Sequence, residues 1–226
     1  MAKKQIKVRV VGSDHSVNKM FRDKESPYFK YVTMDSDIWD KPDLVCFTGG
    51  EDINPILYEE TPIKETKYSK VRDDEDTVWY NRYKDVPKVG ICRGGQFLNV
   101  MSGGAMWQHV DNHSISHDII NLLPIGARWA MGDIFKVTST HHQMMIPGVG
   151  GEVLAIATVP SQDRGLASKY LSSIKRDIPK YDTEVVFYEE TKSLCYQPHP
   201  EYYTGTKNSP NEKYFFDLIE TLLIKE

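Results

Sequence analysis

The stretch Val89-Gly90-Ile91-Cys92-Arg93-Gly94-Gly95-Gln96 decides the fold class of this 226-residue chain. Residues 86–91, with apolar Val86, Val89 and Ile91, predict a buried strand, and residues 94–101 that follow predict a helix. A strand that turns sharply into a helix is the repeating unit of a doubly wound sheet. The stretch therefore predicts an α/β protein.

Segments on both sides of this stretch extend the pattern. In the N-terminal half we expect strands at Gln5–Val11 and Leu44–Phe47, a long loop over 51–70 and a helix at Arg72–Tyr83. Val78 and Trp79 should lie on the inner face of that helix. In the C-terminal half we expect strands at Ile134–Thr138, Gly151–Thr158, Glu184–Tyr188 and Ser193–Gln197, and an amphipathic helix at Asn211–Lys225. The turn signals between these later strands predict an antiparallel section added to the sheet, and residues 161–183 predict a mobile insertion.

The composition is that of a globular protein and argues against nucleic-acid-binding, membrane and disulfide-rich classes. Hydrophobic residues make up 40% and charged residues 27% of the chain, as in ordinary globular proteins. The net charge of -4 gives no basic footprint for nucleic acid or for an anionic membrane. No apolar run is long enough to span a bilayer, the N-terminus has no signal-peptide pattern, and three scattered cysteines form no disulfide framework. We therefore expect one domain over residues 1–226 in the reducing cytoplasm, with no nucleic-acid or membrane partner.

Cys92 occupies the centre of a G-x-C-x-G pattern at the turn between strand and helix. Small residues two places before and after a nucleophile leave room for a strained turn that pushes its side chain outward. The following helix N-terminus favours a thiolate, and the backbone N–H of Arg93 could donate to an oxyanion. The alternative for Cys92 is a buried structural cysteine, because the pattern also occurs by chance. Cys46 and Cys195 lie inside apolar strands, and we interpret both as small core residues.

His199 is the candidate base for this cysteine. It directly follows an apolar strand and lies between Pro198 and Pro200, which stiffen the backbone. Glu201 could bind the far imidazole nitrogen and fix the tautomer. The alternative is a turn histidine beside a solvated glutamate.

His109, His113 and His117 are spaced four residues apart and would share one face of a helix. The intervening Asp111-Asn112 and Ser114 are weak helix formers, and the sequence shows no further ligand nearby. Spacing alone therefore makes metal the less favoured interpretation, and we expect neither a metal nor an organic cofactor.

Four motifs together resemble the class I glutamine amidotransferase-like family, and more narrowly its γ-glutamyl hydrolase subgroup, which includes γ-glutamyl-γ-aminobutyrate hydrolases. They are the nucleophile segment 90–104, Gly49-Gly50-Glu51-Asp52-Ile53-Asn54-Pro55 with Tyr58, Ser139-Thr140-His141-His142-Gln143, and Gln197-Pro198-His199-Pro200-Glu201. They occur in the family's order across residues 49–201. The chain departs from the family at Thr48, where proline is usual, and at Pro198, where an aromatic residue is usual. The family's Asp-Gly loop has no clear copy, and residues 161–183 stand in its place.

The resemblance implies a flavodoxin-like three-layer α/β/α sandwich with a mostly parallel sheet. It implies a Cys92–His199–Glu201 triad, an oxyanion hole from the N–H groups of Gly50 and Arg93, and substrate contacts from Gly49, Gln96, His142 and Gln143.

Three functional hypotheses follow from the resemblance. The first is a free-standing hydrolase that cleaves the γ-glutamyl amide bond of glutamine or a γ-glutamyl amine through a thioester. The second is a glutaminase subunit that supplies ammonia to a separate synthetase. The third is a non-catalytic binding protein on the same fold, which is disfavoured because all three triad positions are filled. The leaving amine, and whether the partner is a second copy of the chain or a synthetase, are left open.

Overall fold

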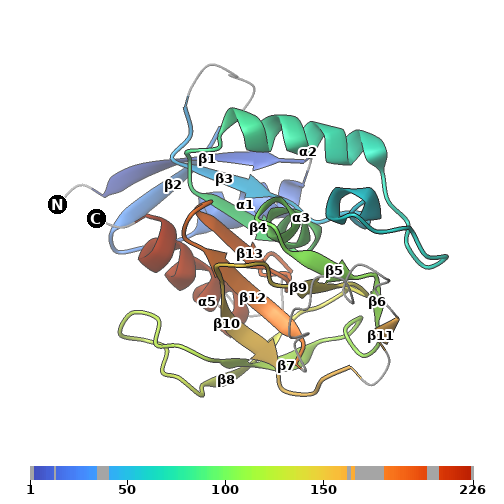
Figure 1. Ribbon diagram of the computed structural model, residues 1–226. Helices are drawn as coiled ribbons and strands as arrows, with labels where there is room; N and C mark the ends of the chain where they lie inside the picture. The colour runs from blue at the N-terminus through green and yellow to red at the C-terminus, as the bar shows by residue number, and fades with distance from the viewer. Residues whose placement is uncertain are drawn as a thin grey trace.

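A mixed sheet forms the centre of the protein in the computed structural model, which describes residues 3–12, 14–34, 41–161, 164–165, 181–202 and 209–224 (Figure 1). Its parallel part consists of β1 (Lys4–Val11), β2 (Phe29–Thr33), β3 (Leu44–Phe47), β4 (Lys88–Ile91) and β13 (Ser193–Tyr196). These strands lie in the order β2-β1-β3-β4-β13, which is the flavodoxin order 2-1-3-4-5. The expected flavodoxin-like α/β class is confirmed.

An antiparallel section continues the sheet beyond β13, as the sequence predicts. It consists of β12 (Thr183–Tyr188), β10 (Gly151–Ala157), β7 (His117–Asn121) and β8 (Ile134–Val137) in that order. Two short strands, β5 (Ala105–Trp107) and β9 (Met144–Ile146), pair with each other, and β9 joins β12. A separate small pair is formed by β6 (His109–Val110) and β11 (Arg164–Gly165).

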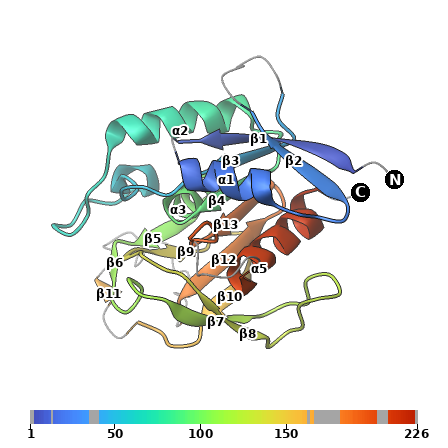
Figure 2. The same cartoon turned by 180° about the vertical axis from the view of Figure 1, so that it is seen from behind.

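Helices cover both faces of the sheet (Figures 1 and 2). On one face, α1 (His15–Asp23), α5 (Pro210–Leu218) and the π-helical turn η2 (Ile219–Leu223) pack into a core with side chains of β1, β3, β4 and β13. On the other face, α2 (Lys70–Arg82) and α3 (Arg93–Met101) pack into a second core with the same sheet. The 3₁₀ helix η1 (Pro55–Tyr58) interrupts the loop predicted over 51–70. Because both faces are covered, β3 and β4 are buried at every position, which explains the unbroken apolar run of β3. In β4 the buried position 88 is a lysine, whose Nζ donates to the Val86 carbonyl at 2.7 Å.

The inner face of α2 differs from the prediction. Val78 is 65% exposed, whereas the buried residues of the helix are Asp73 and Asp76. Both carboxylates form ion pairs with the buried Arg93 of α3. This side of α2 is therefore held to α3 by ion pairs and not by apolar contacts. Trp79 does pack against the second core, as predicted.

Much of the insertion expected at 161–183 lies outside the described residues, apart from Ser161, β11 and 181–183. Within the part of the chain that the structure describes, every helix is too short or too polar to cross a lipid bilayer.

Candidate active site

Cys92 lies at a strained turn between β4 and α3. Its backbone adopts φ 51° and ψ −112°, a conformation that costs a non-glycine residue free energy, and its N–H donates to the carbonyl of Tyr196 at 2.8 Å. A Cβ atom on Gly90 would lie 2.2 Å from the carbonyl oxygen of Gly94, and one on Gly94 would lie 2.1 Å from that of Phe47. Both positions therefore require glycine for the turn to close, as the G-x-C-x-G pattern predicts.

His199 faces Cys92 because β13 runs parallel to β4 as its neighbour in the sheet. The Nδ1 atom of His199 lies 2.7 Å from Glu201 Oε1, and the ring stacks on Tyr202 with centroids 4.2 Å apart. Burial disfavours the imidazolium, but hydrogen bonds to Cys92 and Glu201 outweigh it and raise the pKa of His199 to about 11. The three residues are thus arranged so that an imidazolium can stabilise a neighbouring thiolate.

Thr140 and Tyr202 are contacts of this group that sequence reasoning missed. The Thr140 hydroxyl lies 3.0 Å from His199 Nε2, the nitrogen opposite the one that Glu201 binds. Thr140 belongs to a motif that the sequence does single out, but no spacing rule connects it to His199. The contact depends on long-range folding, which a single sequence does not report.

The predicted oxyanion-hole residues lie side by side. Gly50 adopts φ +157°, and a Cβ atom there would lie 3.1 Å from Cδ of Arg93. A Cβ atom on Gly49 would lie 3.2 Å from His199 Cε1, so this glycine lets the loop pack against the imidazole. The Arg93 side chain points away into ion pairs with Asp73 and Asp76, so the group of Arg93 that lies beside Cys92 is its backbone N–H.

A pocket of about 260 Å³ opens beside these residues. Its lining residues are Gly50, Asp52, Cys92, Gln96, Thr140, His141, His142, Gln143, His199 and Tyr202. Gln96 donates to Gln197 Oε1 at 3.3 Å, and the buried Oε1 of Gln143 has no hydrogen-bond partner among the described residues. At the more exposed rim, His142 Nε2 lies 3.0 Å from Asp52 Oδ1, whose hydrogen bond raises the pKa of His142. Asp52 is a further pocket residue that sequence reasoning did not assign.

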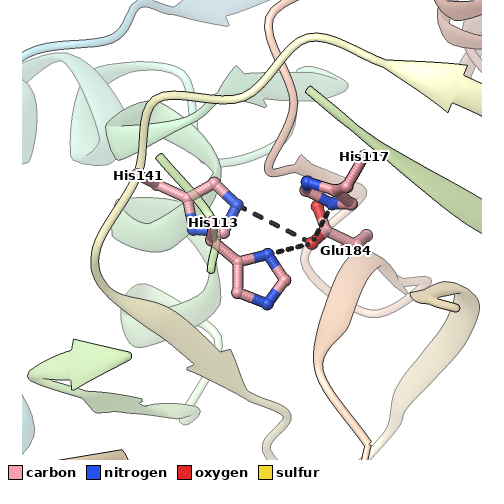
Figure 3. Close-up of side chains that lie close together, drawn as sticks. All are labelled: His113, His117, His141 and Glu184. Carbon is pink, nitrogen blue, oxygen red and sulfur yellow. Dashed lines mark hydrogen bonds and ion pairs between the residues drawn. The ribbon is translucent and has the colours of Figure 1, made fainter. Parts of the chain in front are cut away.

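A second polar cluster adjoins the pocket through His141. The side chains of His113, His117, His141 and Glu184 converge in the interior (Figure 3). The segment with the three spaced histidines is not a helix, because His109 lies in β6 and His117 begins β7. His109 is outside the cluster, and His141 and Glu184 come from distant parts of the chain, so spacing could not have identified it.

Known proteins resemble this chain in sequence and in fold. The family model described as Peptidase C26 matches residues 27–163. A Mycobacterium tuberculosis protein that carries the provisional name of glutamine amidotransferase is 29% identical over 137 residues, which are 54% of this chain and 44% of that protein. The chain spans about half the length of the curated relatives it matches.

Solved structures share the fold. PurLQS from Thermotoga maritima superposes with a TM-score of 0.58 at 16% identity, covering 97% of this chain and 99% of that chain. A glutamine amidotransferase from Thermotoga maritima gives a TM-score of 0.56 at 16% identity, covering 95% of this chain and 84% of that chain. The resemblance drawn from the four sequence motifs is confirmed, and the chain belongs to the peptidase C26 family.

Proposed function

We propose that the chain is a cysteine hydrolase that cleaves the γ-glutamyl amide bond of a small molecule through a thioester on Cys92. The observation that carries the proposal is the strained turn that presents Cys92 to the His199–Glu201 pair at the edge of a polar pocket. The family match and the curated names of its relatives support the same chemistry.

The reaction follows from the geometry in two halves. In the first, the Cys92 thiolate attacks the amide carbonyl carbon, and the backbone N–H groups of Gly50 and Arg93 stabilise the oxyanion. His199 gives its Nε2 proton to the leaving nitrogen, the C–N bond breaks, and the amine departs. In the second, His199 takes a proton from water, the hydroxide attacks the thioester, and the C–S bond breaks to release glutamate and the thiolate.

The pocket supplies polar groups for the glutamyl end of such a substrate. We assign Gln96 and Gln143 to its inner wall, where the unpartnered Gln143 oxygen can accept from an ammonium group. The imidazole of His142 and the carboxylate of Asp52 lie together at the rim, where they supply polar groups for the ends of a zwitterion. Gly49 contributes by letting the loop approach His199.

A glutaminase subunit that feeds a synthetase is the second candidate, favoured by the provisional amidotransferase names of the relatives. Both candidates share the triad and differ in the leaving amine, so the first experiment tests what they have in common. The chain is mixed with γ-glutamyl amides, glutamine included, quenched in acid and examined by intact-mass spectrometry. A glutamyl adduct on Cys92 that is absent from Cys92→Ser supports the proposal. Turnover that persists in Cys92→Ser contradicts it.

A further inference from the structure

The cluster of His113, His117, His141 and Glu184 carries an inference independent of the proposed reaction. Three imidazole nitrogens point at one carboxylate oxygen, Glu184 Oε1. His113 Nδ1 lies 3.2 Å from it, His117 Nε2 3.0 Å and His141 Nε2 3.7 Å. His113, His141 and Glu184 are at most 3% exposed, so solvent does not relieve this crowding.

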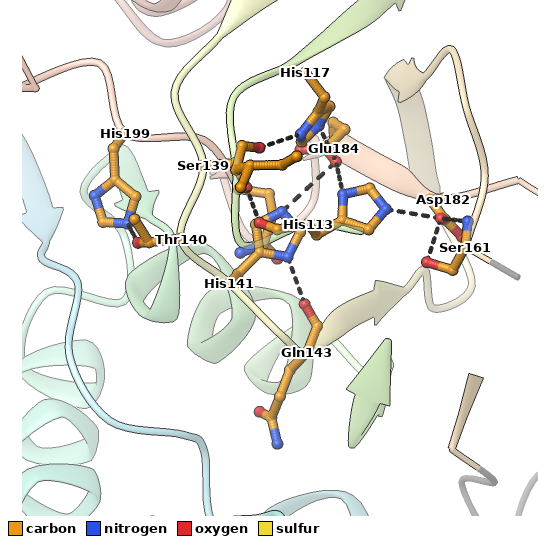
Figure 4. Close-up of polar contacts among 12 residues, drawn as sticks. His113, His117, Ser139, Thr140, His141, Gln143, Ser161, Asp182, Glu184 and His199 are labelled. Carbon is orange, nitrogen blue, oxygen red and sulfur yellow. Dashed lines mark hydrogen bonds and ion pairs between the residues drawn. The ribbon is translucent and has the colours of Figure 1, made fainter. Parts of the chain in front are cut away.

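The outer nitrogen of each ring already has an acceptor (Figure 4). His113 Nε2 lies 2.8 Å from Asp182 Oδ2, His117 Nδ1 lies 3.2 Å from the Ile115 carbonyl, and His141 Nδ1 lies 2.9 Å from the Gln143 carbonyl. A neutral imidazole carries one N–H, and an acceptor at the outer nitrogen places the hydrogen there. The inner nitrogens of His113 and His141 then present lone pairs to the Glu184 carboxylate, an arrangement that repels unless a cation lies between them. His117 Nε2, 3.0 Å from Glu184 Oε1, is aligned for a hydrogen bond as well as for a shared cation.

Buried polar atoms without hydrogen-bond partners also indicate that a cation belongs in this cluster. His113 Nδ1 is near Glu184 Oε1 but lacks the alignment of a hydrogen bond, and His141 Nε2 and Glu184 Oε2 have no hydrogen-bond partner among the described residues. Leaving several polar atoms unsatisfied in one buried place costs free energy. A ligand that accepts lone pairs would satisfy them all.

We propose that His113, His117, His141 and Glu184 form a binding site for a divalent first-row transition cation, with zinc the best match. In a tetrahedral zinc site with bonds near 2.0–2.1 Å, neighbouring ligand atoms lie about 3.3 Å apart. The three nitrogen–oxygen distances bracket this value, and all four ligand atoms lie within 4.8 Å of one another. Three imidazoles and one carboxylate suit zinc, whereas magnesium and calcium prefer sites made of oxygen.

The outer acceptors are those that a zinc site requires. A histidine that ligates a metal usually donates its other N–H to a carboxylate or a backbone carbonyl, which fixes the tautomer. The Asp182 carboxylate is itself oriented by the hydroxyl of Ser161 at 2.7 Å. Four protein ligands and deep burial are typical of a structural site and not of a catalytic one, which keeps a position open.

The site would tie together segments that border the proposed active site. Glu184 lies in β12, His117 begins β7, and His141 lies in the loop between β8 and β9. The neighbours of His141 in that loop, Thr140 and His142, line the pocket beside Cys92. A bound cation would therefore hold one wall of the pocket in place without touching the reacting atoms.

The test uses the whole chain, stripped of metal with a chelator and titrated with Zn²⁺ alone. We expect one Zn²⁺ per chain by calorimetry and metal analysis, a higher melting temperature with Zn²⁺, and a four-coordinate absorption spectrum with Co²⁺. Glu184→Gln and His117→Asn should weaken Zn²⁺ binding by more than about 100-fold. Asp182→Asn, which replaces the carboxylate acceptor of His113 and Ser161 with a neutral amide, should weaken it about 10–100-fold.

Two control variants locate the metal. His15→Asn removes an exposed histidine at the start of α1, and Cys92→Ala removes the nucleophile, so both should keep wild-type affinity. Because Cys92→Ala cannot catalyse the proposed reaction, metal binding in it is judged apart from that reaction. The inference is overturned if the wild-type chain binds no stoichiometric Zn²⁺, if Cys92→Ala loses the metal, or if His117→Asn and Asp182→Asn both retain it unchanged. The Co²⁺ spectrum of the wild-type chain decides the case if Glu184→Gln fails to fold.

Discussion

At the scale of single residues, Cys92 differs from Cys46 and Cys195 in its surroundings. The latter two thiols are fully buried, and burial raises the pKa of each well above its usual value. Cys92 lies at the pocket next to His199. We predict that iodoacetamide alkylates Cys92 far faster than the other two, with loss of activity in step, as peptide mass spectrometry would measure. Faster labelling of either buried cysteine would refute the assignment of the nucleophile.

Glu201 is the residue for which the pH dependence can be predicted. It holds His199 Nδ1 and contributes to the raised pKa of about 11, because a carboxylate favours the neighbouring imidazolium. In Glu201→Gln this stabilisation is lost, so the pKa of His199 should fall and the alkaline limb of kcat/KM should move toward neutral pH. We also expect kcat to drop by orders of magnitude with little change in KM, because Glu201 acts through His199.

A pH–rate profile of Glu201→Gln beside the wild-type chain tests this. Glu190→Gln, an exposed change near the start of β13, is the control and should leave both limbs in place. If Glu201→Gln has the wild-type profile, the carboxylate has no part in setting the charge of His199.

At the scale of secondary-structure elements, α2 is held to α3 by charge. Asp76 is fully buried and pairs with both Arg93 and Arg72, whereas Asp74 on the same helix is exposed and pairs with Lys70. Removing Asp76 takes one of its two carboxylate partners from the buried Arg93 and the carboxylate partner from Arg72, and such losses at buried ion pairs are strongly destabilising. Asp76→Ala should therefore lower the free energy of unfolding in urea by about 3 kcal/mol or more.

Asp74→Ala is the matched control on the solvent side of α2. Exposed pairs contribute little, so we expect a change within about 0.5 kcal/mol. Equal effects of the two variants would mean that the buried pairs with Arg93 do not hold the helix.

Elements with a strong local signature could be predicted from the sequence, and those that depend on distant partners could not. The apolar run of β3 and the glycines around Cys92 report burial and backbone strain at their own positions. The burial of Val78 on the inner face of α2 was predicted wrongly, because Asp73 and Asp76 face Arg93 there and no hydrophobic periodicity marks a buried aspartate. Thr140 and the ligand set around Glu184 likewise assemble from segments that meet only in the folded sheet.

At the scale of the whole molecule, the size of the leaving amine separates the two candidate functions. We expect a glutaminase subunit to hydrolyse glutamine poorly without its synthetase, whereas a free-standing hydrolase needs room beyond the scissile nitrogen. The pocket has a polar rim at Asp52 and His142, which suits an amine-bearing group better than a sealed ammonia path. We predict that the purified chain alone cleaves some γ-glutamyl amine with a higher kcat/KM than glutamine.

Product analysis by mass spectrometry over a panel of γ-glutamyl amines would measure this preference. Weak glutaminase activity alone, stimulated by a co-purifying synthetase, would replace the hydrolase with the amidotransferase component.

The parallel pairing of β4 with β13 has a consequence for biosynthesis. Cys92 follows the first of these strands and His199 follows the second, with the whole antiparallel section between them in the sequence. During translation the thiol therefore leaves the ribosome long before the imidazole that we propose activates it. Domains begin to fold while they are synthesised, but the pocket cannot form until β13 has paired with β4. On the proposed mechanism, His199 therefore cannot activate the Cys92 thiol while the nascent chain is still incomplete and exposed to electrophiles in the cell.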